Sequence, residues 1–385
     1  MTILEKYFAR EIARSVLFVL LGFIALLTFF DIVNEAKNIG AGGYTIVNAL
    51  YYVLLGMPGY VYEYMPLSAL IGTIFVMAQF ASRSEFTIMR VSGFSTSQAI
   101  KMLLKVGLVF VLLTFLFGEL FAPATFKLSK KYQLSVLQSA HEQDFQSGLW
   151  TKDLIRSEEQ NGIRGKTKGE IIGSRFLNVN NVNSSGQLIG IKFYDLDNEF
   201  RLIKQVKADR AEYQGNSVWR LLNVEETWFP LSLSGADMSA VEVKQLAHLD
   251  LMSEITPAIL LASSSDNDTD RMSAYDLNLY SKHLVDNKQN AEKIEIAFWK
   301  KVIYPFAVLV MMALALPFAY LHVRSGGVSL KIFAGIMIGV VFYLLNNIFA
   351  HIGLLNTWPP FVAAVLPSLL FLAAAMAALW YVERH

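Results

Sequence analysis

Long apolar runs lie towards both ends of the chain, and a polar block separates them. Six runs are long enough to cross a bilayer, because about 20 apolar residues in a helix span its hydrocarbon core. They are roughly residues 15–34, 57–80, 98–121, 302–322, 330–350 and 360–381. The pattern therefore predicts an integral membrane protein with three spans on either side of a middle block.

Basic residues beside the predicted spans orient them in the membrane. Alternate junctions carry nearly all of these residues: Lys6, Arg10, Arg14, Arg83, Arg90, Lys101, Lys105, Arg324, Lys331 and Arg384. The turn 351–359 has no Lys or Arg, and the turn after the first span has only Lys37. Cytoplasmic loops carry an excess of Lys and Arg. We therefore expect both termini in the cytoplasm and the middle block outside, in the periplasm of a Gram-negative cell.

From about residue 145 to 233 the apolar runs give way to alternation. Ile189, Ile191 and Phe193 alternate with other residues, and turn-forming residues separate such strand-like pieces. Short strands at close spacing predict an antiparallel sandwich or jelly roll. Its interior is expected to contain the large apolar residues of this block, Leu149, Trp150, Trp219 and Trp228.

A polar linker at residues 263–268 leads into a predicted helix before the fourth span. Ser273, with Asp276 three residues later, is a capping-box pattern, and the helix is expected to continue through Lys301. The chain is thus expected to have three parts. They are an N-terminal transmembrane half (1–122), a β-jelly-roll domain (123–272), and a connecting helix with the C-terminal transmembrane half (273–385).

Composition supports the membrane class and narrows the possible chemistry. The chain is 54% hydrophobic and only 17% charged, which is less charge than soluble domains usually carry. Its net charge of +1 gives no electrostatic preference for nucleic acid. Cysteine is absent, which excludes disulfides and thiolate metal sites, and the six histidines lack ligand spacing. We therefore expect no metal and no cofactor.

One segment resembles a nucleotide-binding loop, but the match fails. Residues 164–167 read Arg-Gly-Lys-Thr, yet Gln160 stands where a P-loop needs glycine. A solvated turn explains the segment better. No Gly-x-Ser-x-Gly elbow appears either, so the sequence predicts no catalytic residues and no ATPase site of its own.

Three carboxylates, Asp31, Glu63 and Glu119, lie within or near the outer ends of predicted spans. Ionisable groups at that depth face a wet cavity or the headgroup zone. The sequence leaves both possibilities open for each of them.

The segment 81–94, between the second and third spans, is short, charged and amphipathic. Phe86 and Met89 could form one apolar edge, Glu85 could fix the register of a contact, and Gly93 could end a short helix. Such a helix suits docking on a soluble partner. An ordinary charged turn would have the same residue types.

This segment resembles a known family. Ser84-Glu85-x-x-x-Met89-x-x-x-Gly93-Phe94-Ser95 is similar to the coupling-helix motif of the lipopolysaccharide export permeases, the LptF/LptG family. Further pieces follow in the family's order: Gly40-x-Gly42-x-Tyr44, Pro58 with Pro66, Gly118-Glu119-x-x-Ala122-Pro123, Gly148-Leu149-Trp150-x-Lys152-Asp153, Phe298-Trp299-x-Lys301-x-x-x-Pro305 and Gly339-x-x-Phe342-Tyr343. The loop after span one and the start of the β domain favour the LptG branch over LptF.

The resemblance implies a permease subunit of an ABC-type lipopolysaccharide exporter in the Gram-negative inner membrane. Its implied partners are an LptF-type paralogue, a dimer of the LptB-type ATPase, which hydrolyses the ATP, and an LptC-type single-span protein. Lipopolysaccharide would enter from the membrane between spans one and five. The β domain would then pass it to a periplasmic bridge.

The resemblance also implies site residues. Glu85 matches the family's coupling glutamate, with Arg83, Phe86, Met89 and Arg90 beside it. The expected lipid-binding residues are Asp31, Lys37, Glu63, Lys127, Lys130, Lys131, Phe342 and Tyr343.

The family's phosphate-contacting lysines and arginines are only partly present. Lys37 and Lys130 match basic positions of the family, whereas Asp31, Asn38 and Gly59 stand where some relatives have lysine, and Gln133 replaces an arginine. Phosphate recognition is therefore expected to be weaker, or to use other residues such as Lys127 and Lys131.

Two other functions remain open. The first is the LptF-type role in the same complex. The second is a membrane-anchored periplasmic scaffold whose spans serve only as anchors. Polar and proline-kinked spans argue against the scaffold, because plain anchors need no wet interior.

Overall fold

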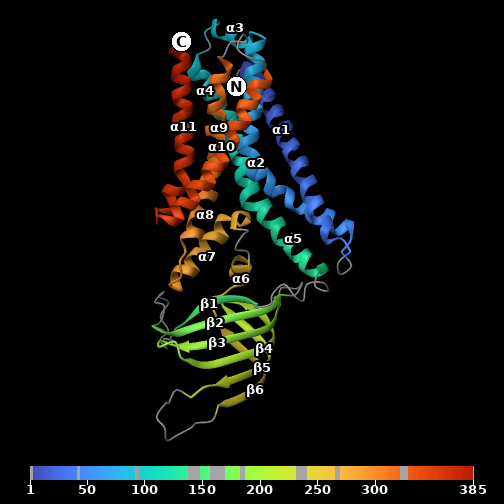
Figure 1. Cartoon of the computed structure of the whole chain (residues 1–385), viewed down its shortest axis with the longest axis vertical. Helices are drawn as coiled ribbons and strands as arrows, with labels where there is room; N and C mark the ends of the chain where they lie inside the picture. The colour runs from blue at the N-terminus through green and yellow to red at the C-terminus, as the bar shows by residue number, and fades with distance from the viewer. Residues whose placement is uncertain are drawn as a thin grey trace.

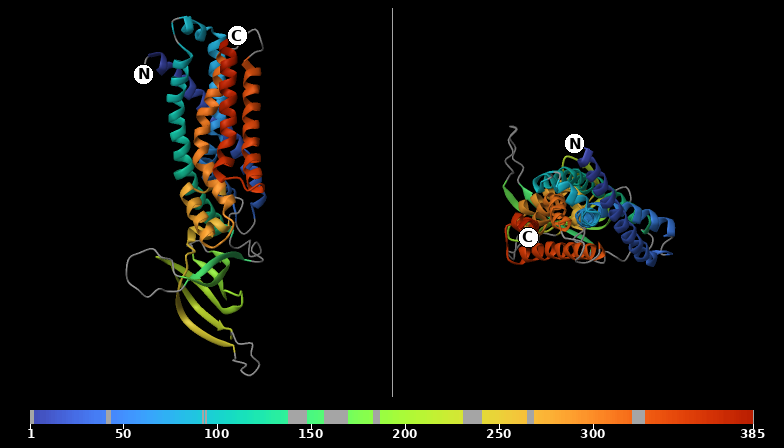
Figure 2. Two further views of the ribbon diagram at one scale, coloured as in Figure 1. Left: turned by 90° about the vertical axis from the view of Figure 1, so that its left-hand side faces the viewer. Right: turned by 90° about the horizontal axis from the view of Figure 1, so that it is seen from above.

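A computed structural model describes residues 3–40, 44–91, 93, 95–137, 148–156, 170–182, 187–230, 241–264, 269–320 and 328–384. The molecule is elongated, with a helical bundle at one end and a β-sheet at the other (Figure 1). Both chain ends and the short helix α3 (Glu85–Val91) lie at the end of the bundle far from the sheet (Figures 1 and 2). The length of the bundle therefore separates Glu85 from the middle domain.

The bundle is built from long apolar helices. In chain order they are α1 (Ile3–Glu35), α2 (Ile46–Ser82), α4 (Thr96–Leu116) with the π-helical turn η3 (Phe117–Phe121) and α5 (Ala122–Leu137), α8 (Glu292–Ile303) with η5 (Tyr304–Phe306), α9 (Ala307–Ala315) and η6 (Leu316–Ala319), α10 (Val328–Leu355), and α11 (Pro360–Arg384). Six helices of the described chain are long and apolar enough to cross a membrane, at the six predicted places. The predicted spans are confirmed.

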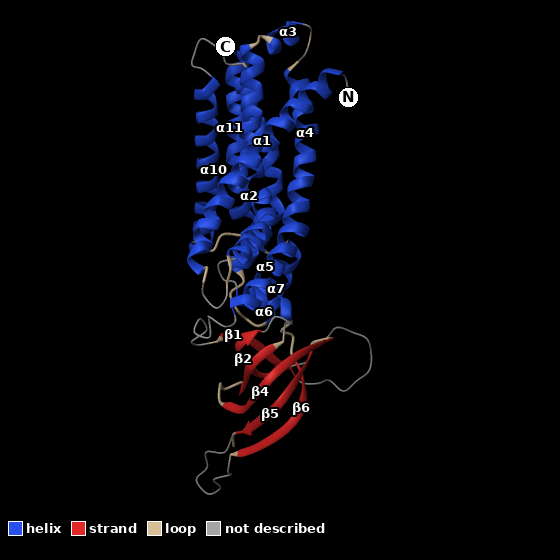
Figure 3. Ribbon diagram, turned by 90° about the vertical axis from the view of Figure 1, so that its right-hand side faces the viewer, coloured by secondary structure: helices blue, strands red, loops and turns tan. Residues whose placement is uncertain are grey.

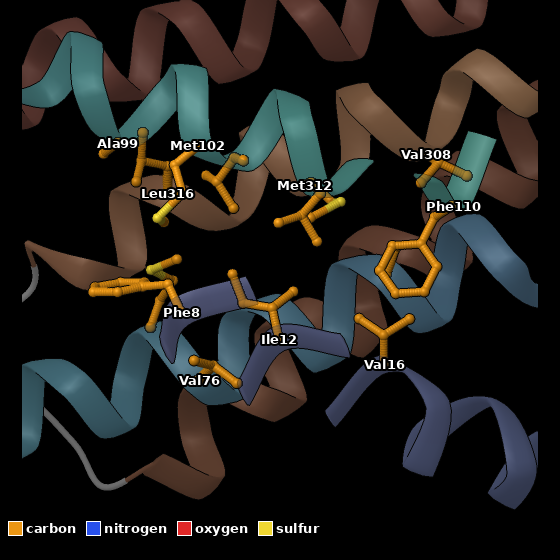
Figure 4. Packing of buried hydrophobic residues seen from close by; sticks show 14 of the residues in the cluster. Phe8, Ile12, Val16, Val76, Ala99, Met102, Phe110, Val308, Met312 and Leu316 are labelled. Carbon is orange, nitrogen blue, oxygen red and sulfur yellow. The ribbon is translucent and has the colours of Figure 1, made fainter. Parts of the chain in front are cut away.

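The core near the α3 end lies between α1, α2, α4 and α9. Phe8, Ile12 and Val16 of α1 are fully buried there, and they face Met102 and Met312 across the core (Figure 4). α1 and α2 approach closely because Gly72 has no side chain: a Cβ there would lie 2.7 Å from the Cα of Val16. Small residues allow such contacts between membrane helices, where packing replaces the hydrophobic effect.

The middle domain is a single antiparallel sheet within the described residues. Its strands are β1 (Leu149–Arg156), β2 (Ile171–Val182), β3 (Leu188–Asp197), β4 (Leu202–Gly215), β5 (Val218–Trp228) and β6 (Glu242–Met252). They pair in sequential order, and the sheet is not closed. The predicted class, six transmembrane helices plus an antiparallel β domain, is confirmed. Figure 3 shows the sheet below α6 (Pro257–Ser264) and α7 (Ala274–Asp286).

The large apolar residues of the sheet lie on different faces. Trp219 is only 1% exposed, and its Nε1 donates to the carbonyl of Ile255 at 2.8 Å. Leu149 packs against the same core. Trp150 and Trp228, however, are 50% and 39% exposed, so their predicted core positions are wrong. Adjacent strand residues point to opposite faces, so Trp150 points away from the core that Leu149 contacts.

Both exposed tryptophans make side-chain contacts, Trp150 on the outer face of the sheet and Trp228 at the edge of the core face, in line with the buried Val224. Trp150 stacks on Tyr194 with ring centroids 5.6 Å apart. The Lys204 ammonium lies 4.6 Å from the ring centroid of Trp228, a cation–π contact. These contacts explain how large aromatic residues are accommodated outside the core.

The connection back to the membrane differs from the single predicted helix. α7 ends at Asp286 and α8 begins at Glu292, with Lys288 in the left-handed region at φ 54°. The predicted N-cap is confirmed, since the Ser273 hydroxyl accepts from the Asp276 amide at 3.1 Å. α6 covers the first part of the predicted polar linker, and η4 (Thr269–Arg271) follows residues that lie outside the description.

His283 is buried where α7 meets β1. Its ring hydrogen-bonds the backbone of Lys152 and the side chain of Asn287. Burial lowers the pKa of His283, although Asp153, Glu254 and Asp286 nearby oppose that shift. The unfolded chain therefore binds a proton more readily than the folded chain below the ordinary histidine pKa of about 6.5.

We expect this junction to lose stability as the pH falls from about 6.5 through the lowered pKa of His283. Urea unfolding of the β domain in the full chain, measured at pH 7.5 and pH 5.5, tests this. A His283→Gln variant should show a smaller difference between the two midpoints, because glutamine does not titrate. Equal pH dependence in both proteins would contradict the assignment.

Candidate functional site

α3 lies across the end of the bundle between α2 and α4. Ser84 and Gly93 flank it with left-handed backbone at φ 58° and 89°, so the predicted helix stop at Gly93 is confirmed. Glu85 begins the helix, where its Oε2 accepts from the Tyr7 hydroxyl at 3.4 Å. Arg83 Nη1 lies 3.8 Å from Glu85 Oε1. The carboxylate is therefore held at the surface by one residue from α1 and one from the preceding turn.

The structure describes only part of the predicted apolar edge of α3. Met89 packs against the bundle core, whereas Ile88 and Val91 are exposed. The side chains of Phe86 and Arg90 lie outside the described residues. The exposed apolar surface described on α3 therefore comes from two residues that the sequence had not singled out.

The predicted lipid-binding residues lie at the opposite end of the bundle. Asp31 of α1 accepts a hydrogen bond from the Tyr60 hydroxyl of α2, and Lys37 is exposed in η1 (Ala36–Asn38). Lys127 of α5 forms an ion pair of 2.8 Å with Asp276 of α7. The side chains of Lys130 and Lys131 lie outside the described residues.

Phe342 and Tyr343 differ sharply in their surroundings. Phe342 is 5% exposed and packs edge-on against Phe371 with ring centroids 5.1 Å apart, so it belongs to the core between α10 and α11. Tyr343 is 46% exposed, and its hydroxyl lies 3.4 Å from Glu63 Oε1. Of the predicted set, the structure therefore brings Glu63 and Tyr343 together.

Glu63 and Tyr343 line a cavity of about 250 Å³ between α2, α8, α10 and η4. Polar residues from four separate parts of the chain meet there, namely Tyr60, Asp270, Arg271, Lys300, Lys301, Asn346 and Asn347. Sequence reasoning singled out none of these as site residues, because only the packing of α8 against α2 and α10 brings them together. No group of three or more acidic or histidine side chains in the described ranges could hold a metal ion.

Lys301 is the most buried cation of this cavity, at 3% exposure. Its Nζ donates to the Asp270 carbonyl at 2.9 Å and lies 4.1 Å from the ring centroid of Tyr62. A buried ammonium requires such compensation, because desolvation alone would strongly disfavour it. Lys301 therefore fixes η4 against the bundle.

Glu119 holds the start of α7 from the neighbouring helix. It lies in the π-helical turn η3, and both of its carboxylate oxygens are 3.0 Å from the backbone nitrogen of Ala274. A carboxylate at a helix N-terminus satisfies a free N–H and complements the helix dipole. In the described structure, Glu119 therefore contacts protein backbone rather than lining the cavity.

The neighbouring residue, Gly118, allows η3 to pack on α2. A Cβ at this position would lie 2.5 Å from the Tyr62 ring, the same ring that Lys301 contacts. We expect Gly118→Ala to destabilise the chain by about 1–3 kcal/mol, because the ring and then Lys301 would have to move. Thermal unfolding in detergent measures this effect.

The matched control for Gly118→Ala is Gly22→Ala on α1, where a Cβ would meet nothing within 4 Å. This substitution should be neutral or slightly stabilising, since alanine favours helix. If both variants unfold at the wild-type temperature, the close packing of η3 on Tyr62 does not contribute to stability.

Comparison with known proteins gives consistent results. A family model described as lipopolysaccharide export system permease LptF/LptG matches residues 6–381. The lipopolysaccharide export system permease protein LptG of Escherichia coli K12 is 28% identical over 385 residues, covering 99% of this chain and 98% of the relative. The protein of the same name from Haemophilus influenzae Rd is 27% identical over 371 residues, covering 96% of each.

Proposed function

The chain belongs to the LptF/LptG family of lipopolysaccharide export permeases, and we propose that it is the LptG-type subunit of an ABC-type exporter. In this role it extracts lipopolysaccharide from the inner membrane and passes it to a periplasmic bridge. The family match from residue 6 to 381 carries the proposal. The relatives named LptG, similar over nearly their full lengths, support the LptG role.

The proposed orientation has both termini and α3 in the cytoplasm and the sheet in the periplasm. The distribution of Lys and Arg around the spans supports it, as does the position of α3 at the end of the bundle opposite the sheet (Figure 1). We propose the boundaries 1–122, 123–272 and 273–385 for the three parts of the chain. The helical continuity from α4 through η3 into α5 means that the first boundary falls within a helix.

ATP is hydrolysed by a partner in this proposal, an LptB-type dimer docked on α3. Glu85, Arg83 and the exposed Ile88 and Val91 supply a charged and apolar contact of the kind such docking needs. Phe86, Met89 and Arg90 remain proposed neighbours of this contact. An LptF-type paralogue and an LptC-type single-span protein complete the complex.

The lipid path is proposed to run along the outer end of the bundle, beside α1 and α10. Glu63, Tyr343 and the exposed Lys37 lie at that end and support this path. Asp31, Lys127, Lys130 and Lys131 are kept as proposed contacts of the lipid headgroup. Lys127 would first have to leave Asp276. Phe342 would act only indirectly, since its ring is buried against Phe371.

A photo-crosslinking amino acid at Tyr343 or Lys37, in the complete complex in cells, tests the transport role. Lipopolysaccharide adducts are expected at both positions, and their yield should decrease when the complex hydrolyses ATP. The control position is Leu370 on α11, which is equally exposed but lies away from the cavity. Absence of adducts at both test positions would favour the alternative of a membrane-anchored periplasmic scaffold.

Pull-down separates the LptG role from the paralogous LptF role. Co-expressed with an ATPase and one candidate partner at a time, the chain should form a stable complex with the LptF-type subunit. A stable complex with an LptG-type partner instead would reverse the assignment while leaving the family membership intact.

A further inference from the structure

The cavity between α2, α8, α10 and η4 contains both acidic and basic groups. The Tyr343 hydroxyl of α10 lies 3.4 Å from Glu63 Oε1 of α2. Lys300 of α8 and Arg271 of η4 line the same cavity. A volume of about 250 Å³ suits a headgroup rather than a whole lipid.

The cation of Lys300 is only weakly engaged by the protein. Its Nζ lies 3.7 Å from Asp270 Oδ1 and 3.4 Å from Asn347 Oδ1, both long for a charge-assisted hydrogen bond. Lys301, by contrast, is fully engaged by a carbonyl and an aromatic ring. Arg271 also lines the cavity, and its guanidinium carbon lies 5.7 Å from the centroid of the Phe126 ring, a contact that leaves its N–H donors available. Lys300 and Arg271 are therefore the cavity cations with capacity to bind an anionic group.

The surroundings of Glu63 suit a cation. The Glu63 carboxylate accepts one long hydrogen bond from Tyr343, and the Tyr60 ring lines the same cavity. Carboxylates and aromatic rings together recognise ammonium groups. The cavity therefore offers both a site for an anion and a site for an ammonium group.

We propose that this cavity binds a phosphoethanolamine headgroup, with its phosphate on Lys300 and Arg271 and its ammonium on Glu63. Lys300 lies just before the apolar run 302–322 of the fourth span, near the depth at which lipid headgroups lie. Both phospholipids and decorated lipopolysaccharide carry this group. The inference requires only that the chain spans a membrane, so it and the export proposal can fail independently.

Lipid binding to the full chain, purified in detergent and stripped of lipid, tests the proposal by native mass spectrometry. Phosphatidylethanolamine should bind about tenfold more tightly than phosphatidylglycerol with the same acyl chains, the gain expected from one charge-assisted contact. O-phosphorylethanolamine should compete for the site, and inorganic phosphate at the same concentration should not. Equal binding of the two lipids would overturn the ammonium site.

Two substitutions test the ammonium site and the phosphate site separately. Glu63→Gln should lower the affinity for phosphatidylethanolamine alone, so that the two lipids bind equally. Lys300→Gln should lower the affinity for both lipids about tenfold. The matched control is Lys293→Gln, at an exposed position on the same helix as Lys300. This substitution should change the affinity for neither lipid. If Lys300→Gln fails to give monodisperse protein, Lys300→Met tests the same loss of charge. Unchanged binding in the Glu63 and Lys300 variants would overturn the assignment of the cavity.

The source of the headgroup is resolved by competition with lipopolysaccharide. Competition only by lipopolysaccharide that carries phosphoethanolamine would identify the export substrate as the natural ligand. Competition by phosphatidylethanolamine, with no difference between decorated and undecorated lipopolysaccharide, would identify a resident phospholipid. Failure of every phosphoethanolamine compound to compete would overturn the proposal.

Discussion

Glu85→Lys is expected to abolish ATP-driven release of lipopolysaccharide from proteoliposomes that contain the complete complex. The substitution reverses the charge at the start of α3 and places a second cation beside Arg83, which now lies 3.8 Å from the carboxylate. Truncating one partner of a buried interfacial charge pair costs about 2–5 kcal/mol, so at least a tenfold loss of ATPase affinity is expected. Co-purification with the ATPase and timed lipid release measure the two effects.

The controls for Glu85→Lys distinguish lost coupling from lost folding. Glu199→Lys changes the same charge on an exposed turn of the β domain and should export normally. The Glu85→Lys protein should elute as monodisperse material and keep the wild-type unfolding temperature, because Glu85 is a surface residue of the isolated chain. Normal export by Glu85→Lys would exclude this residue from the ATPase contact.

Trp219→Ala is expected to destabilise the β domain more than any other single tryptophan change in the sheet. The side chain is fully buried, its ring packs on Tyr213 at 5.1 Å, and its Nε1 donates to the Ile255 carbonyl. Large aromatic-to-alanine changes in cores cost about 3–5 kcal/mol, and the carbonyl of Ile255 would also lose its partner. The urea midpoint of the domain should fall by about 1–2 M or more.

Trp150→Ala is the matched control on the other face of the sheet. Trp150 is half-exposed, so its loss removes only the stacking contact with Tyr194 and should cost much less. Fluorescence and limited proteolysis of the full chain follow the unfolding of the domain in both variants. Equal destabilisation by the two changes would mean that the assigned core face of β5 is incorrect.

The membrane spans follow from the sequence because the length of an apolar run is a property of a continuous segment. Each apolar run is long enough to identify a helix without knowledge of its neighbours. The packing face of α3 was harder to predict from the sequence. Over seven residues, the apolar positions of the segment allow more than one face, and only contact with the bundle selects Met89 as the buried residue.

The β domain shows where a period-two pattern is insufficient. Ile189 was expected on the same face as Ile191, yet Leu188 is buried and Ile189 is not. Gly190, at φ 64°, changes the phase of the strand between them. A left-handed glycine inside a strand is a local geometric event, and the alternation of residue types on either side does not reveal it.

The cavity could not be predicted from the sequence, for a different reason. Its walls come from 56–63, 270–271, 297–304 and 343–347, segments that meet only when three helices and a short turn pack together. Lys300 and Lys301 are adjacent in sequence and identical in type. Only their surroundings make one a buried structural cation and the other a candidate ligand contact.

Three attachments hold the segment that leads from the sheet into α7. Glu119 binds the Ala274 amide, Lys127 binds Asp276, and Lys301 binds the Asp270 carbonyl. A rigid body fixed at one point can swivel, and at two points it can still turn about the line between them. A third point outside that line removes this last freedom. Tilting of the third or fourth span would therefore rotate α7 together with that span.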